Sequence, residues 1–552
     1  MNKALNNGIW ITNFEVEGNY IVIEEKFNDS YRYGVANIAE YKLNNTAMYI
    51  FEDHDKNDIA IFETPGQLNI YLSSKTKSKT PLIKINLNIV NDQVEIIKYD
   101  SFSVDDENVL FINDGLAIAY YKYGKSLSIL DFFNEKKQVI FLENDILDIL
   151  SNEYSLIIKS YNRGSIYFEQ ILLKDYSIKQ LRLPNIEIKI NSKWVVNNDY
   201  LLIFLNDTLW KINLSQIDFE SSYISSKHLN NIFSVNKNTN NSNQFLIQKC
   251  NWPNTDIQIY DLEKNGFQDK EFCGNYYIHK AKGYEQGYVL LTSKVNEFPA
   301  LKIVNIESSN NVLESNENSQ YSIKIFYEKY DGKEIPYIYM KNNKKKNDNL
   351  IFMFHGGPSG AHYNTWNPFV NLLLKYNYDV VMLNNIGSVI PSCGLPYIKK
   401  GEYGTKDIRS ITNLIEKCSL GYKNIFAYGN SYGGYLSVLL AKINRNIKRV
   451  VITSSFLDSR TLVNSKDVTI RNFAKIAMKK NIVADTQTIS FPLLILNGEK
   501  DYKLPTADIK RASIDNPLIE YIEFKGESHV FRKLKNIEEW MTKSILFLER
   551  GL

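Results

Sequence analysis

A serine set among glycines at residues 429–435 (GNSYGGY) is the feature that most constrains the fold of this chain. It separates an apolar run at 425–428 from a helix-forming run at 436–441. A serine with a glycine two residues away on each side, between a strand and a helix, is typical of a nucleophile elbow. We expect Ser431 to adopt a strained backbone conformation there, with glycines allowing the strand and helix to approach closely. Because short motifs recur by chance, this interpretation depends on its context.

A second glycine-rich motif upstream supplies part of that context. Residues 351–354 (IFMF) read as a buried strand that leads directly into HGGP at 355–358. Such a turn after an early strand is typical of an oxyanion loop, in which a backbone N–H donates to the carbonyl oxygen under attack. We take the N–H groups of Gly357 and Tyr432 as the candidate donors. His355 and Gly356 are expected to order the loop.

Ser431, Asp501 and His529 follow one another in the order typical of α/β-hydrolases, each just after a predicted strand. In such a triad the histidine takes the serine proton, and the aspartate fixes the histidine tautomer. Taken singly, Asp501 would be a turn residue and His529 a structural histidine. Their shared order and their positions at strand ends favour a catalytic triad.

Residues 320–552 resemble the prolyl oligopeptidase family of serine peptidases, especially its acylaminoacyl- and dipeptidyl-peptidase branch. The resemblance is carried by GNSYGGYL, HGGP, NGEKDYKLP around Asp501 and GESHVF around His529. It implies an α/β-hydrolase domain with a mostly parallel sheet, preceded by a β-propeller, and the same oxyanion donors. One departure is NNIGS at 384–388, where the family commonly has Asn-Tyr-Arg-Gly-Ser. The missing arginine could alter substrate contacts or only local packing.

The first half of the chain tests this resemblance independently. Residues 1–310 contain short apolar or alternating runs separated by turn-forming residues, a pattern that predicts an all-β unit. An apolar–polar–apolar strand end also recurs at the spacing of a four-stranded propeller blade. Seven instances predict a seven-bladed propeller at 1–315, before a hydrolase domain at 316–552. Their central residues are Lys42, Asn86, Asp131, Lys174, Asn213, Asp261 and Asn305.

These motifs predict a serine peptidase that hydrolyses short or unstructured peptides through an acyl-enzyme on Ser431. By resemblance, the propeller would restrict access. An esterase, an amidase or an acyl-transferring (cyclising) enzyme would use the same triad, so these alternatives stay open. A non-catalytic protein that binds through its propeller is a third reading. Glu24 and Glu25 could bind the N-terminal ammonium of a peptide, although two exposed or strand-edge carboxylates are the simpler interpretation.

Composition limits the partners of the chain. The 65 basic and 62 acidic residues nearly balance, so no nucleic-acid partner is expected. The four cysteines have no metal-ligand spacing and no dense disulfide pattern, so we expect no metal, no cofactor and a reducing, cytoplasmic location. No membrane partner is expected, because no stretch approaches about 20 apolar residues and no signal-peptide core is present. A short peptide is the expected partner, and a homo-oligomer is left open.

Overall fold

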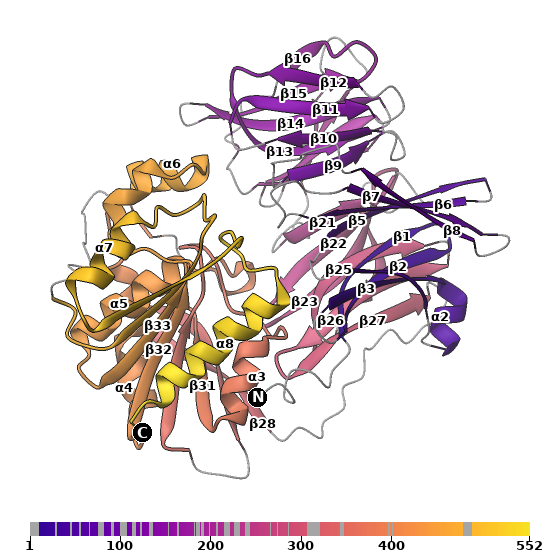
Figure 1. Cartoon of the computed structure of the whole chain (residues 1–552). Helices are drawn as coiled ribbons and strands as arrows, with labels where there is room; N and C mark the ends of the chain where they lie inside the picture. The colour runs from indigo at the N-terminus through magenta and orange to yellow at the C-terminus, as the bar shows by residue number, and fades with distance from the viewer. Residues whose placement is uncertain are drawn as a thin grey trace. The chain divides into compact units, whose positions relative to one another are not determined.

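The computed structural model describes two compact units (Figure 1). One contains the described residues of Ile9–Thr292 and Pro299–Leu313, and the other those of Ser293–Phe298 and Glu314–Leu552. The residues described are 10–551 except 28–29, 45–46, 54–56, 66, 75–81, 90–92, 100–107, 113–116, 122–123, 132–135, 153, 163–164, 182, 184–187, 189–191, 198, 206–207, 215–220, 226–231, 238–242, 265, 273, 285, 306–320, 343–346, 396–397, 400 and 478–487.

The first unit consists of antiparallel sheets, each built from strands that follow one another in the chain. The first sheet contains β1 (Trp10–Glu17), β2 (Tyr20–Phe27), β3 (Ser30–Asn37) and β4 (Met48–Asp53), and the second contains β5 (Asn57–Thr64), β6 (Gln67–Ser74), β7 (Leu82–Asn88) and β8 (Val94–Tyr99). The third sheet contains β9 (Asn108–Ile112), β10 (Ala117–Tyr121), β11 (Ser126–Asp131) and β12 (Lys136–Phe141), and the fourth contains β13 (Asp145–Ser151), β14 (Ser155–Asn162), β15 (Ser165–Leu172) and β16 (Ile178–Leu181). The fifth sheet contains β17 (Lys193–Val196), β18 (Tyr200–Leu205), β19 (Thr208–Asn213) and β20 (Ser221–Ser225). The sixth contains β21 (Ile232–Lys237), β22 (Gln244–Asn251), β23 (Asn254–Asp261) and β24 (Gly266–Phe272). The seventh contains β25 (Tyr277–Tyr284), β26 (Gly287–Lys294) and β27 (Glu297–Asn305).

Neighbouring sheets share apolar cores, as the blades of a propeller do. Phe168 of the fourth sheet packs edge-on against Trp194 of the fifth, with ring centroids 5.2 Å apart. Phe14 of the first sheet lies in one cluster with Val289 of the seventh, so the last sheet packs against the first. The described residues of the first unit thus form seven sheets, and the predicted seven-bladed propeller is confirmed.

The repeated triplet lies in the third strand of a sheet in five of its seven instances, and the prediction is wrong for the other two. Lys174 lies in the turn after β15. Asn86, for example, lies in β7, whereas Lys42 lies in a helix, α2 (Ile38–Asn44), that follows β3. The side chain of Asn37 accepts the N–H of Ala39 at 3.0 Å, and asparagine in this position favours the start of a helix. The apolar–polar–apolar pattern of residues 41–43 is therefore accommodated in a helical turn.

The second unit is an α/β-hydrolase domain with a mostly parallel sheet, as predicted. Its strands lie in the order β28-β29-β31-β30-β32-β33-β34-β35, parallel from β31 onward. Its elements are β28 (Tyr321–Tyr330), β29 (Lys333–Asn342), β30 (Asn349–Phe354), α3 (Pro368–Lys375), β31 (Tyr378–Leu383), η2 (Pro391–Cys393), α4 (Lys406–Ser419), β32 (Asn424–Asn430), α5 (Tyr432–Ile443), β33 (Ile447–Thr453), η3 (Ser459–Asn464), α6 (Val468–Ala477), β34 (Leu493–Gly498), α7 (Ala507–Asp515), β35 (Ile519–Phe524) and α8 (Leu534–Glu549).

Helices cover both faces of this sheet, which explains why its central strands are almost wholly apolar. Helices α4 and α5 pack on one side with Leu350, Phe352 and Phe354 of β30. Helices α3 and α8 contact one another on the other side (Figure 1). Among the described residues, no helix is both long and apolar enough to cross a bilayer.

The start of α5 lies directly against the end of β30, and glycine permits this contact. A Cβ atom on Gly433 would lie 2.4 Å from the carbonyl oxygen of His355 and 2.6 Å from that of Phe354. Both neighbours are main-chain atoms, which cannot move aside as a flexible side chain can. The packing of strand, turn and helix around Ser431 therefore depends on the missing side chain.

We predict that Gly433→Ala lowers the free energy of unfolding by about 3 kcal/mol, because overpacking against backbone forces the strand and helix apart. Urea unfolding of the purified variant measures this change. Gly266→Ala is the matched control, since its Cβ would meet only the carbonyl oxygen of Lys264, 3.7 Å away. A Gly433→Ala protein as stable as the control would contradict the contact.

Candidate active site

Ser431 occupies a strained turn at the carboxyl end of β32. Its φ and ψ are 52° and −123°, which places this non-glycine residue at positive φ, at the N-terminal cap of α5. Its N–H donates to the carbonyl oxygen of Thr453 in the neighbouring strand at 2.9 Å. Such a conformation costs about 1–3 kcal/mol and persists only where surrounding contacts hold it. This is the geometry expected of a nucleophile elbow.

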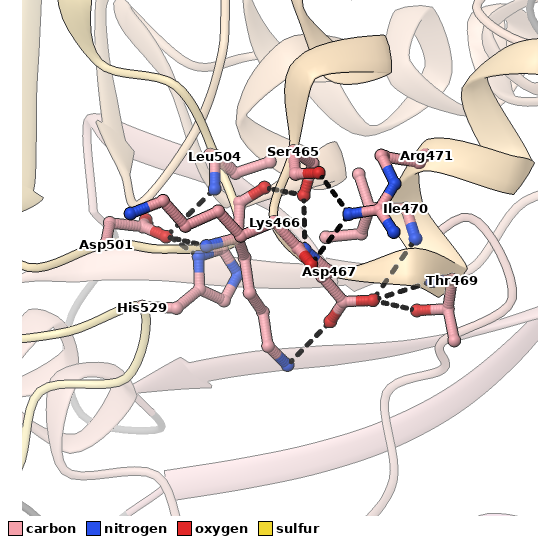
Figure 2. Close-up of polar contacts among 10 residues, drawn as sticks. Ser465, Lys466, Asp467, Thr469, Ile470, Arg471, Asp501, Leu504 and His529 are labelled. Atoms are coloured by element: carbon pink, nitrogen blue, oxygen red, sulfur yellow. Dashed lines mark hydrogen bonds and ion pairs between the residues drawn. The ribbon is translucent and has the colours of Figure 1, made fainter. Parts of the chain in front are cut away.

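Asp501 and His529 meet at the same edge of the sheet, after β34 and β35 (Figure 2). The Nδ1 atom of His529 lies 2.8 Å from Oδ2 of Asp501, whose carboxylate is fully buried. The other carboxylate oxygen accepts the N–H groups of Lys503 and Leu504 at 2.9 and 3.0 Å. With Nδ1–H donating to Asp501, Nε2 of His529 is left to accept a proton. The structure therefore joins these two candidates directly, while the sheet brings Ser431 to their edge.

A network that the sequence did not reveal fixes the loop of Asp501 to the start of α6 (Figure 2). The Ser465 hydroxyl donates to the carbonyl oxygen of Lys503, whose ammonium lies 3.8 Å from the carboxylate of Asp467. Asp467 is itself buried and accepts the N–H of Thr469 at 2.8 Å, an N-capping bond for α6. These residues are too far apart in sequence to form a recognisable motif.

The loop of His529 is held in a similar way by Glu527. This side chain is 1% exposed, and its two carboxylate oxygens accept the N–H groups of Arg532 and Lys533, both at 2.9 Å. The side-chain amide of Asn536 donates a third bond at 2.8 Å. Glu527 thus ties the segment with His529 to the start of α8, a role that its place in the GESHVF motif did not disclose.

The candidate oxyanion loop is ordered by a neutral histidine. Nε2 of His355 lies 2.8 Å from the Ser388 hydroxyl, which also accepts the N–H of Asn385 at 3.0 Å. Because the other ring nitrogen faces a carbonyl oxygen, which can only accept, Nε2 of the neutral ring accepts the Ser388 proton. Nδ1 then carries the hydrogen and faces the carbonyl oxygen of Gly356 at 3.3 Å. Burial lowers the pKa of His355 to about 4, which keeps the ring uncharged at neutral pH. Gly357 follows with φ of 68°.

Tyr432, the other candidate donor, is the first residue of α5. The N–H groups of a first helical turn have no intrahelical acceptor, so they are suited to bind an oxyanion. Because Gly433 contacts the carbonyl oxygens of Phe354 and His355, the loop of Gly357 lies beside Tyr432. The start of the candidate oxyanion loop therefore lies against the first turn of α5.

The structure shows the surroundings of two features that the sequence left open, the position of the missing arginine and the pair Glu24 and Glu25. Ile386, at the position where the family commonly has arginine, is 1% exposed and packs with Ile335 and Ile398, so it belongs to an apolar core. Glu24 is fully buried and accepts the hydroxyl of Tyr33 at 2.7 Å, and Arg32 donates to Glu25 at 2.9 Å. Both carboxylates are engaged within their own sheet. They are buried in β2, which lies between β1 and β3, so the expectation of exposed or strand-edge carboxylates was wrong.

We predict that Asp501→Asn lowers kcat by about 10⁴-fold, because an amide no longer holds His529 in the required tautomer. Steady-state hydrolysis of an activated ester measures the loss. Asp348→Asn, which removes a carboxylate paired with Lys423 on the exposed surface, is the control and should retain kcat. A loss below roughly tenfold in Asp501→Asn would assign the acid to another residue.

The low pKa of His355 predicts a specific acid sensitivity. A histidine whose folded pKa is depressed contributes stability that is complete above about pH 6.5 and is lost as the pH falls through about 4. The slope within that window is about 1.4 kcal/mol per pH unit. His355→Gln should flatten the decline of the unfolding free energy between pH 7 and 4.5, and the exposed His279→Gln should not. An unchanged slope in His355→Gln would refute the assignment.

The comparison with known proteins agrees with this arrangement. Residues 349–494 match the family described as alpha/beta hydrolase fold. Over 175 residues the chain is 24% identical to the uncharacterized peptidase YuxL of Bacillus subtilis, a match that covers 28% of this chain and 26% of that protein. The chain thus spans about a quarter of the length of this curated relative.

Solved structures resemble the whole chain. The acylaminoacyl peptidase of Pyrococcus horikoshii superposes with a TM-score of 0.75 at 12% identity, covering 100% of this chain and 97% of that one. A puromycin-hydrolyzing peptidase of Mycobacterium tuberculosis gives 0.72 at 9% identity, covering 100% and 96%. A prolyl endopeptidase gives 0.74 at 9% identity, covering 99% and 90%. The chain therefore has the fold of the prolyl oligopeptidase family, a β-propeller joined to an α/β-hydrolase domain, as its motifs predicted.

Proposed function

We propose that this protein is a serine peptidase that hydrolyses short or unstructured peptides through an acyl-enzyme on Ser431. The observation that carries the proposal is the hydrogen bond between His529 and the buried Asp501, formed at the sheet edge where Ser431 occupies its strained turn. Serine is a weak nucleophile on its own, and this pairing supplies the base that activates it. The likeness of fold to several peptidases supports the choice of substrate.

The geometry supports a two-step mechanism. Oγ of Ser431 attacks the substrate carbonyl while Nε2 of His529 takes the hydroxyl proton, and Asp501 stabilises the imidazolium. The N–H groups of Gly357 and Tyr432 stabilise the oxyanion, a feature worth about 3–4 kcal/mol for one donor. The tetrahedral intermediate then expels the amine, which takes the proton from His529. Water, deprotonated by His529, hydrolyses the acyl-enzyme and restores Ser431.

Two further parts of the proposal rest on likeness and composition. An acylaminoacyl peptidase of the same fold is described in complex with the peptide derivative Z-Gly-Gly-Phe-chloromethyl ketone, with 12% identity to this chain. This supports a peptide substrate. That the propeller restricts access is what the resemblance to the family implies. Cys418 is a free thiol, which supports a cytoplasmic location.

A second candidate function is hydrolysis or transfer of a small acylated compound. It is favoured by one observation, that structures of the same fold are described as puromycin hydrolases. The triad chemistry would be the same, and only the acyl donor or the acceptor would differ.

We predict that the wild-type protein cleaves members of a mixed pool of short peptides and that Ser431→Ala does not, because the variant lacks the nucleophile. The pool should contain free, N-acetylated and proline-containing peptides, and mass spectrometry identifies the cut positions. Cleavage by both proteins would refute the acyl-enzyme. Cleavage of no peptide, with turnover of a p-nitrophenyl ester by wild type alone, would favour the second candidate function.

A further inference from the structure

The peptide unit between Ser431 and Tyr432 is held through its carbonyl oxygen. The hydroxyl of Ser455, a fully buried residue in the loop after β33, donates to this oxygen at 2.7 Å. The helical N–H of Gly434 donates to the same atom at 3.0 Å. The carbonyl and N–H of a trans peptide point in opposite directions. Fixing the carbonyl oxygen of Ser431 therefore fixes the direction of the Tyr432 N–H.

The side chain of Tyr432 is held separately, from α4. Its hydroxyl donates to Oδ2 of Asp407 at 2.5 Å and accepts the N–H of Gly404 at 3.0 Å. Asp407 is fully buried, and Tyr432 is 3% exposed with its ring centroid 6.5 Å from that of Phe456. Breaking such a bond leaves a buried polar group without its partner, so the arrangement has few alternatives.

We propose that Ser455 and Asp407 are positioning residues for the oxyanion hole. Ser455 fixes the peptide plane, and Asp407 anchors the ring of Tyr432, so that its N–H is aimed at the developing oxyanion. This inference rests on the proposed function, because it takes the Tyr432 N–H as an oxyanion donor. If the Tyr432 N–H no longer points at the oxyanion, the enzyme binds the transition state less tightly, while its binding of the substrate changes little. We therefore expect kcat to fall and KM to be retained.

The test uses two readouts on the full chain. Hydrolysis of p-nitrophenyl hexanoate gives kcat and KM, and inhibition by 1,1,1-trifluoroheptan-2-one reports the oxyanion hole, because the ketone adds to the serine as a hemiketal anion. We expect Ser455→Ala and Tyr432→Phe each to lower kcat by roughly tenfold to a hundredfold. This loss is smaller than the loss of kcat that follows complete removal of an oxyanion donor. KM should stay within about twofold, and the inhibition constant should rise by the same factor as kcat falls.

Matched controls break the same kinds of bond elsewhere in the domain. Ser437→Ala removes a buried hydroxyl that donates to the carbonyl oxygen of Gly433 at 2.8 Å, further along α5. Tyr422→Phe removes a hydroxyl that donates to Asp379, which lies in β31 near its amino end. Both controls should keep the kcat and the inhibition constant of wild type, even where their melting temperature falls.

Asp407→Asn is the third, conservative variant. Because the asparagine side chain can still accept a hydrogen bond from the Tyr432 hydroxyl, this variant should retain more activity than Tyr432→Phe. The inference would be overturned if kcat fell no further in the test variants than in the controls, or if kcat fell while the inhibition constant of the ketone did not change. Either result would leave the proposed function standing. A wild-type protein that neither hydrolyses the ester nor binds the ketone would overturn both. If Ser455→Ala does not fold, Tyr432→Phe decides the question alone.

Discussion

The main-chain contact between α5 and the end of β30 is the constraint on which the rest of the candidate site depends. Gly433 lies against the carbonyl oxygens of Phe354 and His355, so the turn of Ser431 and the loop of Gly357 are parts of one packed unit. The same closeness removes His355 from water, which is why its pKa falls and its ring stays neutral. A charged imidazole there would be costly, so loop order and histidine protonation state are linked.

Three buried carboxylates hold the segments around this contact. Asp501 accepts bonds from His529 and two backbone N–H groups, and Glu527 accepts two backbone N–H groups and the amide of Asn536. Asp407 accepts the Tyr432 hydroxyl and two backbone N–H groups. A buried charge is destabilising unless its hydrogen bonds are satisfied, and once satisfied it restricts the segment to one geometry. The site is therefore held by polar contacts behind it as well as by the apolar core.

The sequence predicted the parts of this molecule that local pattern specifies. Parallel strands deliver their carboxyl ends to one edge, so Ser431, Asp501 and His529 could be recognised as a set, and repeated strand ends revealed the propeller. It did not predict Ser455 or Asp407, because Ser431 and Tyr432, to which they bond, lie 24 and 25 residues away and a lone serine or aspartate carries no signal. The triplet around Lys42 failed for a local reason, since Asn37 starts a helix there.

Strain and order at the elbow have a common physical basis. The positive φ of Ser431 costs about 1–3 kcal/mol, and it is maintained because both sides of the residue are bonded, the N–H to Thr453 and the carbonyl to Ser455. Packing of the following turn adds to this, with the rings of Tyr435 and Phe456 stacked 4.8 Å apart. Folding has therefore already met the cost of orienting the Tyr432 N–H. A dipole that needs no reorientation during the reaction favours the charged transition state over the neutral substrate, so the contacts that hold the strained turn are also those that should raise kcat.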